Sequence, residues 1–190
     1  VTLDYSMLAG CNLVIESASE RLDIKRQVLA RIEQAVAEDC IIGFTTSSLT
    51  RAAIVEHAMY PERCLVMHPF YPAWRKPVME VVRSGNPLHD ERAEQYLIAL
   101  GKVPIAVQDV PCLAGNRIFC GLMQLALQLV AQGSFGTAAQ INAILRDKLG
   151  GGGVLFVHDL IPGSNGLTAN CLEELALHLR NPWWQPHPLL

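Results

Sequence analysis

Short apolar runs alternate with amphipathic stretches through the first half of the chain. Residues 12–16 form a brief apolar run that ends in a carboxylate, and residues 20–37 carry apolar side chains at helical spacing with charges between them. The strand pattern returns at residues 40–44 and 64–67, with a helix expected over residues 48–57 between them. Strands that alternate with crossover helices pair in parallel, so this pattern predicts an α/β fold with a mostly parallel sheet.

The pattern changes near residue 110. Residues 77–82 and 103–107 predict two further strands, with a helix over about 89–100 between them. Strand signals stop after Pro111, and the rest of the chain predicts helices, over about 113–132, 137–148 and 167–179.

We therefore predict an α/β domain over residues 1–110 and an all-α domain over residues 111–190. Open α/β sheets bind their ligands at the carboxyl ends of the strands. The residues that directly follow each predicted strand are the first candidates for a functional site.

The composition excludes several classes of protein. Hydrophobic residues make up 51% of the chain and charged residues 17%, which excludes intrinsic disorder. A net charge of −3 provides no basic surface, so we expect no nucleic-acid partner. The uncharged residues 118–145 are interrupted by glutamines and glycines, so we expect a buried helix there and no membrane span. The six cysteines form no C-x-x-C pair and no signal peptide is recognisable, so we expect buried thiols, no metal site and a cytoplasmic protein.

One histidine and one carboxylate lie on neighbouring predicted strands. His68 directly follows an apolar strand and is followed by Pro69 and Pro72, and Glu80 lies twelve residues later within another apolar strand. A carboxylate is costly to bury unless it is paired, so we expect Glu80 within hydrogen-bond reach of His68. Such a pair is typical of a general base and the residue that orients it. The alternatives are a loop histidine without a catalytic role and a glutamate exposed on an edge strand.

Two further polar positions are candidates for substrate contact. Residues 45–48 lie between a strand and a helix, so Ser47 or Ser48 either caps that helix or presents a hydroxyl to a substrate. Asn116 stands at the head of an otherwise apolar helix, where its amide either binds a substrate oxygen or caps the helix.

In their order along the chain, these motifs resemble the L-3-hydroxyacyl-CoA dehydrogenase family. The matching patterns cover the chain from about residue 10 to about residue 188. They are V-I-E-x-x-x-E-x-L-x-x-K (residues 14–25), T-S-S-L (46–49), H-P-F-Y-P (68–72), V-M-E-V-V (78–82) and P-x-x-x-x-N-R (111–117).

The resemblance implies an NAD-dependent oxidation of a secondary alcohol, an L-3-hydroxyacyl-CoA or a related 3-hydroxy acid, to the 3-keto compound, as in fatty acid metabolism. It implies that His68 is the general base, that Glu80 orients it, and that Ser47 and Asn116 bind the substrate. The hydride chemistry belongs to the cofactor. The residues that the resemblance places in the NAD site, beside the nicotinamide ribose, are Ser17, Glu20, Lys25 and Ser47.

Some positions depart from the family pattern. The family usually carries asparagine where Thr45 and Tyr71 stand, and residues 150–159 replace a loop that typically contains Met-Gly-Pro. The proline after His68 and Pro77 before Glu80 favour the branch of the family that acts on carnitine or sugar acids as an alternative substrate class.

The glycine fingerprint G-x-G-x-x-G is absent from the sequence. In the family it belongs to the first half of the Rossmann sheet, so we expect this chain to be the second half of such a sheet, with residues 12–16 as an exposed edge strand, followed by the helical domain. The alternative is a non-catalytic homologue or a dimerisation module. We also expect a homodimer, because a helix that is apolar nearly all round, within residues 118–145, has to be covered.

Overall fold

The computed structural model describes residues 4–190. The chain divides into two compact units, one that ends at Leu113 and one that begins at Ala114. Each unit is described by itself below.

The first unit is built around one five-stranded sheet with the strand order β1-β2-β3-β4-β5. β1 pairs with β2 and β2 with β3 in parallel, β4 runs antiparallel to β3, and β5 is parallel to β4. The predicted α/β fold with a mostly parallel sheet is confirmed. The antiparallel pair follows from a short connection, since a parallel pair would need a crossover of a dozen residues or more. The strands are β1 (Leu13–Glu16), β2 (Ile41–Phe44), β3 (Cys64–Pro69), β4 (Val78–Val82) and β5 (Val103–Ala106).

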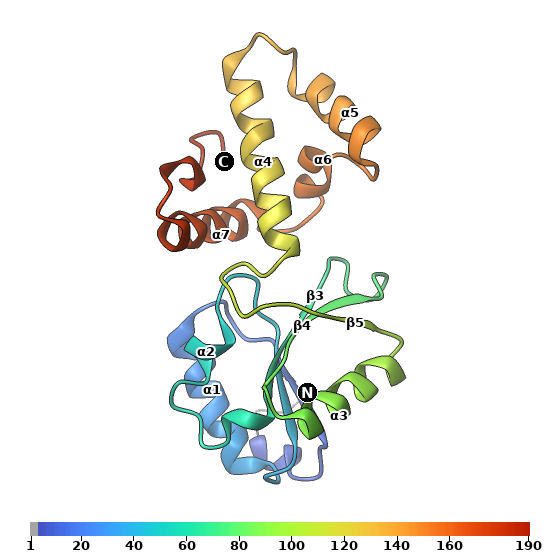
Figure 1. Ribbon diagram of the computed structural model, residues 1–190, viewed down its shortest axis with the longest axis vertical. Coiled ribbons are helices and arrows are strands. Elements are labelled where there is room, and N and C mark those ends of the chain that lie inside the picture. Colours follow the sequence, from blue (N-terminus) through green and yellow to red (C-terminus); the bar gives the residue numbers. More distant parts are fainter. Residues whose placement is uncertain (1–3) are drawn as a thin grey trace. The chain divides into compact units, whose positions relative to one another are not determined.

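Helices cover both faces of this sheet. α1 (Leu22–Ala35) and α2 (Arg51–Ile54) lie on one side, and α3 (Pro87–Ala99) lies on the other (Figure 1). Alternate residues of β2 therefore enter different cores: Ile42 packs in the α1 cluster and Ile41 in the α3 cluster. Burial on both faces explains why the central strands are continuously apolar in sequence. β1 lies at the edge of the sheet, as expected, and its Ile15 is 40% exposed.

The second unit consists of helices, among them one that the sequence pattern does not predict. α6 occupies six residues after a run of four glycines, too short to show a helical period. Met123, Ala126 and Ile141 form part of the core of this unit. Its helices are α4 (Gly115–Gln132), α5 (Ala138–Leu149), α6 (Val154–Asp159) and α7 (Ser164–Leu179). Short 3-10 turns lie at Tyr5–Leu8, Pro61–Arg63 and Pro182–Trp184.

Two polar residues of this unit are more buried than the sequence suggests. His158 is 2% exposed, and its ring stacks on Phe119 with centroids 6.4 Å apart. Gln124, one of the glutamines that interrupt the apolar residues 118–145, is also buried. Its Nε2 donates to the carbonyl oxygens of Trp183 at 2.9 Å and Gln185 at 2.6 Å, so it fastens the C-terminal segment to α4.

The cysteine side chains lie mostly in the interior of the protein, as the apolar surroundings of several of them in the sequence predict. All six cysteines are reduced thiols, and every one except Cys11 is buried. No group of histidine, cysteine and carboxylate side chains in the described chain is arranged to hold a metal ion. None of the helices within residues 4–190 is both long and apolar enough to span a bilayer.

Candidate active site

His68 and Glu80 face each other across the antiparallel pair β3 and β4. They are direct register partners, so both side chains leave the same face of the sheet. His68 Nδ1 lies 2.9 Å from Glu80 Oε2, and the two residues are only 6% and 3% exposed. The predicted proximity is confirmed. With Nδ1–H donating to the carboxylate, the lone pair of the neutral ring is on Nε2, which is the acceptor that a general base needs.

Ser47 lies on the other side of the His68 ring. Its Oγ is 3.5 Å from His68 Nε2. Ser47 follows β2, and β2 is parallel to β3, so the carboxyl ends of both strands adjoin. The sheet thus places a hydroxyl and a carboxylate on the two ring nitrogens of one imidazole, at the end of β3.

Ser47 and Ser48 do not cap the following helix, which corrects one expectation of the sequence analysis. α2 extends only over Arg51–Ile54, shorter than the predicted 48–57, and its N-cap is Thr50. The carboxylate of Asp109 accepts from the backbone N–H groups of Arg51 at 2.6 Å and Ala52 at 2.8 Å. A side chain 57 residues further along therefore supplies the acceptors that the first turn lacks.

The loop between β2 and α2 is organised by Glu20. Glu20 Oε1 accepts from the backbone N–H groups of Ser47 and Ser48, each at 2.8 Å. It also accepts from Thr46 Oγ1 at 2.7 Å and Ser48 Oγ at 2.9 Å. Four donors of one loop thus converge on a single carboxylate oxygen.

Lys25 is fully buried beneath this loop. Its Nζ donates to Glu16 Oε2 at 2.8 Å and to the carbonyl oxygens of Thr45 at 3.0 Å and Ala18 at 3.4 Å. These acceptors take up the three hydrogens of the ammonium group. Lys25 therefore ties the carboxyl end of β1 to that of β2, and its predicted contact with the nicotinamide ribose stays a prediction.

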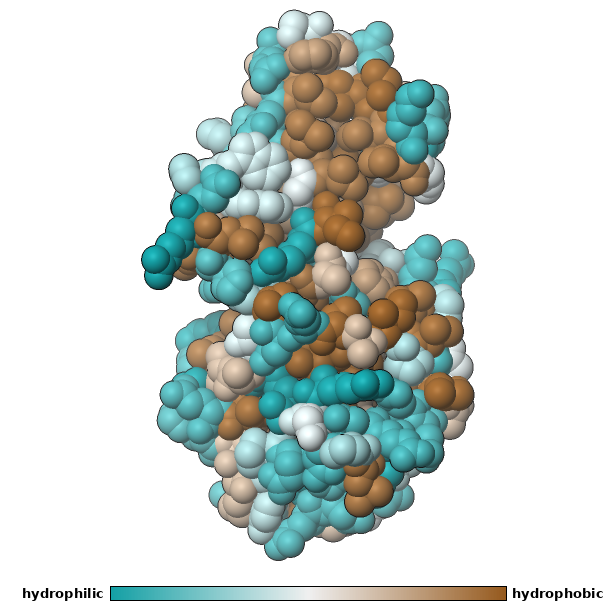
Figure 2. Space-filling model, in the orientation of Figure 1, coloured by the Kyte–Doolittle hydropathy of each residue, from teal (hydrophilic) through white to brown (hydrophobic). Residues whose placement is uncertain are grey.

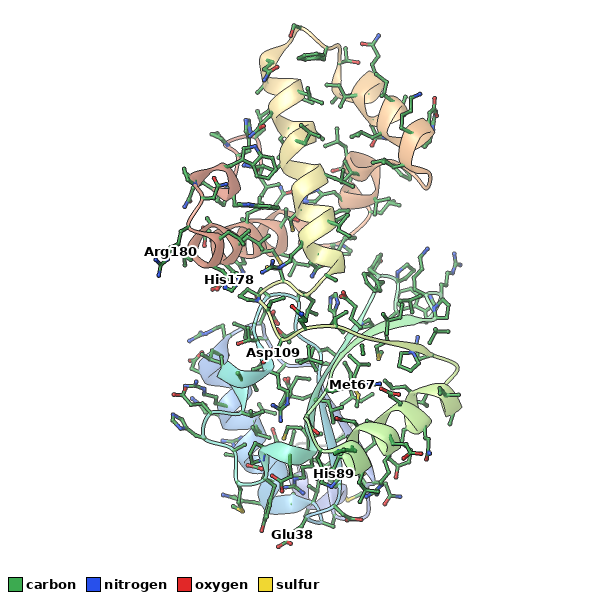
Figure 3. All side chains as sticks on the ribbon, in the orientation of Figure 1. Glu38, Met67, His89, Asp109, His178 and Arg180 are labelled. Atoms are coloured by element: carbon green, nitrogen blue, oxygen red, sulfur yellow. The ribbon has the colours of Figure 1, made fainter. Side chains whose placement is uncertain are left out.

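The remaining predicted site residues are less closely grouped. Ser17 is exposed just beyond β1. Asn116 is the second residue of α4 and belongs to the other unit, so its role as a substrate ligand also stays a prediction. Figure 3 places Asp109 at one end of the first unit and Glu38 and His89 at the opposite end, so His89 is remote from the strand ends where Ser47 lies.

Sequence reasoning gave no role to Glu16, Thr46, Phe70 or Asp109. Phe70 packs edge-on against the His68 ring, with centroids 5.5 Å apart. Glu16 is the last residue of β1, and Asp109 follows β5. A carboxylate at the carboxyl end of a strand is the signal that would have identified both. Thr45 and Tyr71 are the two positions where the family usually carries asparagine. Thr45 Oγ1 donates to the Glu16 carbonyl oxygen at 3.1 Å. Tyr71 is 47% exposed, and its ring is in edge contact with that of Trp74.

The residues at the ends of β1 and β2 fit the nicotinamide ribose end of NAD. Glu20 Oε2 lies 4.0 Å from Lys25 Nζ and forms no hydrogen bond within the described chain, and the Ser17 side chain is exposed. Both would hold ribose hydroxyls. The chain contains no G-x-G-x-x-G loop, the motif that holds the pyrophosphate of the cofactor.

Comparison with known proteins gives consistent matches. The family described as "3-hydroxyacyl-CoA dehydrogenase, NAD binding domain" matches residues 1–110. L-carnitine dehydrogenase of Pseudomonas putida is 33% identical over 95% of this chain, which spans 58% of that relative's length. The structure of (S)-3-hydroxybutyryl-CoA dehydrogenase PaaH1 from Ralstonia eutropha superposes with a TM-score of 0.89 and 26% identity, over 99% of this chain and 66% of its own. FadB2 of M. tuberculosis, at a TM-score of 0.91 and 24% identity over 99% of this chain and 67% of its own, shares the fold.

Proposed function

The chain belongs to the 3-hydroxyacyl-CoA dehydrogenase family, and we propose that it supplies the proton-transfer site for an NAD-dependent oxidation of a secondary alcohol to a ketone. The observation that carries this proposal is the arrangement of Ser47, His68 and Glu80. Ser47 Oγ lies 3.5 Å from His68 Nε2, and His68 Nδ1 lies 2.9 Å from Glu80 Oε2. The buried carboxylate of Glu80 fixes the His68 imidazole. The other ring nitrogen, Nε2, faces the Ser47 hydroxyl at the ligand-binding edge of the sheet.

His68 is the general base in this reaction. Its Nε2 takes the proton of the substrate hydroxyl and becomes part of an imidazolium ring. Bound NAD would supply the acceptor for the hydride that leaves the carbinol carbon. Glu80 stabilises the charged ring through Nδ1, and because both residues are nearly buried, this interaction is only weakly screened by water.

Ser47 holds the reacting oxygen in place. Its Oγ is close enough to Nε2 that a substrate oxygen hydrogen-bonded to Ser47 also lies near the base. Ser17 and Glu20 are proposed to contact the ribose end of the cofactor. Lys25 is proposed to act at this end through Glu16 and the loop that it supports. Asn116 stays proposed as a second ligand of the substrate.

The substrate is a 3-hydroxy compound, either a 3-hydroxyacyl-CoA or a small 3-hydroxy acid. One observation favours a carnitine-like substrate: the segment that follows His68 carries two exposed aromatic rings, Tyr71 and Trp74, whose centroids are 5.9 Å apart. Aromatic faces attract quaternary ammonium groups. Trp74→Ala should raise KM for L-carnitine and leave KM for 3-hydroxybutyryl-CoA unchanged; equal effects on both would argue against this role.

His68→Gln tests the reaction itself. In an active dehydrogenase that carries this sequence, we expect kcat to fall by about 10²–10⁴, the usual contribution of a positioned general base, with a smaller change in KM. His89→Gln, at the opposite end of the sheet, is the matched control. A His68→Gln variant with normal activity would contradict this role. An unmutated protein that carries this sequence and binds NAD but oxidises no 3-hydroxy compound would favour the alternative of a non-catalytic homologue.

We further propose that the helical unit pairs with a second copy of itself. Figure 2 shows a continuous hydrophobic surface over α4, α5 and α6. The exposed residues on these helices include Ile118 at 66%, Leu125 at 42% and Ile144 at 55%. Apolar surface of this extent is typical of an interface. Sedimentation should report a dimer that dissociates on Leu125→Glu and persists on Gln132→Glu, an exposed polar position of the same helix; a monomer at micromolar concentration would contradict the proposal.

A further inference from the structure

We propose that Glu20 is a positioning residue whose carboxylate takes the place of a bound anion in the loop of residues 46–48 and thereby holds Ser47 against His68. The loop donors that converge on its Oε1 are two consecutive backbone N–H groups and two hydroxyls. Consecutive N–H groups that point to one spot form the concavity with which proteins bind phosphate and other anions. Here the chain supplies the anion itself.

Burial makes this carboxylate necessary to the loop. Thr46 and Ser48 are 1% and 4% exposed, so water does not readily replace Glu20 as their acceptor. The loop is fastened on its other side as well, because Thr46 Oγ1 accepts from Leu49 N at 3.0 Å and Ser48 O accepts from Cys112 N at 3.1 Å. Removing Glu20 therefore frees the segment around Ser47 while its two flanks stay attached.

The two carboxylate oxygens of Glu20 have different surroundings. Oε1 is occupied by the loop, and Oε2 faces Lys25 Nζ at 4.0 Å. One residue thus links the serine that faces the base to the edge where the nicotinamide ribose is proposed to bind. This inference rests on the proposed function only for the statement that Ser47 acts on substrate; the positioning itself is independent of any reaction.

The test is NMR spectroscopy on the 190-residue chain and two variants. In Glu20→Ala we expect amide hydrogen exchange at Ser47 and Ser48 to accelerate about tenfold to a hundredfold, the effect of losing a hydrogen bond to a charged acceptor. The ¹⁵N shift of His68 Nε2 should change at the same time. Asp90→Ala is the matched control: Asp90 accepts from Ser84 N at 2.7 Å, Ser84 Oγ at 2.8 Å and Gly85 N at 3.2 Å, and its loss should loosen that loop alone.

Added formate distinguishes an anion role from simple packing. Formate should restore slow exchange at Ser47 and Ser48 in Glu20→Ala, saturably, and have no effect on the wild-type chain. If Glu20→Ala does not fold, Glu20→Gln carries the measurement, since it keeps an acceptor and removes the charge; we expect upfield amide proton shifts and faster exchange at both serines. Unchanged exchange, or loosened amides that formate does not restore, would overturn the inference. None of these readouts involves substrate, so their failure is distinct from failure of the proposed reaction, which His68→Gln tests.

Discussion

Replacing Lys25 by methionine should destabilise the first unit strongly. The change removes an ammonium group that is fully buried and leaves the carboxylate of Glu16, whose side chain is 1% exposed, without its cation. Glu16 Oε1 keeps one donor, the backbone N–H of Ala18 at 2.5 Å. The carbonyl oxygens of Thr45 and Ala18 lose their donor as well.

The magnitude follows from this burial. Removing one partner of a buried ion pair costs about 3–5 kcal/mol, because the remaining charge is left in a medium of low dielectric constant. In the double variant Lys25→Met with Glu16→Leu no charge is stranded, so it should be more stable than Lys25→Met alone by about 2 kcal/mol. The exposed pair Arg21 and Asp23, with side chains 67% and 54% exposed, is the control, and Arg21→Met should cost less than about 1 kcal/mol.

The assay is hydrogen exchange of the β2 amides as a function of urea, which reports the first unit separately from the helical unit. If the free energy of unfolding falls by about 2 kcal/mol per molar urea, Lys25→Met should lower the urea concentration at the unfolding midpoint by about 2 M. A loss no larger than that of Arg21→Met, or a double variant that costs the sum of both single changes, would refute the reasoning. A lysine that serves mainly as a cofactor ligand would give that first result.

Three further predictions concern the site and its surroundings. Glu80→Gln should lower kcat by about 10²–10⁴ with little change in KM, because the amide no longer stabilises the charged ring or fixes its tautomer; steady-state kinetics that match the wild type would contradict this role. Burial raises the pKa of the Cys64 thiol to about 12, so iodoacetamide at pH 9 should not label it in the folded chain and should label it in urea, as mass spectrometry would show. Because this pKa is raised, the thiol favours the folded state below its unfolded pKa of about 8.5, and this contribution is lost as the pH rises from there towards 12. Calorimetry should detect no saturable binding of NAD to the 190-residue chain, which has no G-x-G-x-x-G loop; micromolar binding would mean that the pyrophosphate site is elsewhere.

The fold and the central pair were accessible from sequence because each depends on a local signal. Apolar runs of four to six residues identify the strands, and the cost of burying an unpaired Glu80 points to a partner on the neighbouring strand. Strand spacing alone also places Ser47 at the same edge of the sheet, since β2 and β3 are parallel.

Other features of the first and second units were not accessible from sequence, because they depend on contacts between distant segments. A serine before a helix is a common N-cap, and nothing in residues 45–54 shows that Asp109 supplies the acceptors in its place. A lysine on an amphipathic helix is typical of a solvent-facing position, whereas Lys25 reaches back over the ends of two strands. His158 can be buried because its ring packs against Phe119, which follows from the packing of α4 and α6 and leaves no local signature.

The register between β3 and β4 keeps the His68–Glu80 pair apart from the exposed residues that could recognise a ligand, so the two features need not constrain each other in evolution. His68 and Glu80 are held opposite each other by the ladder itself, whereas the intervening residues 70–77 leave the sheet and carry the exposed rings. Insertions, deletions or substitutions in the connection formed by residues 70–77 can therefore change what the protein recognises without displacing His68 from Glu80. A shift of the ladder by one residue would have the opposite effect, since it would send the two side chains to different faces. A family with one chemistry and many substrates is the expected outcome of such an arrangement, and directed evolution of new specificity should begin in this connection.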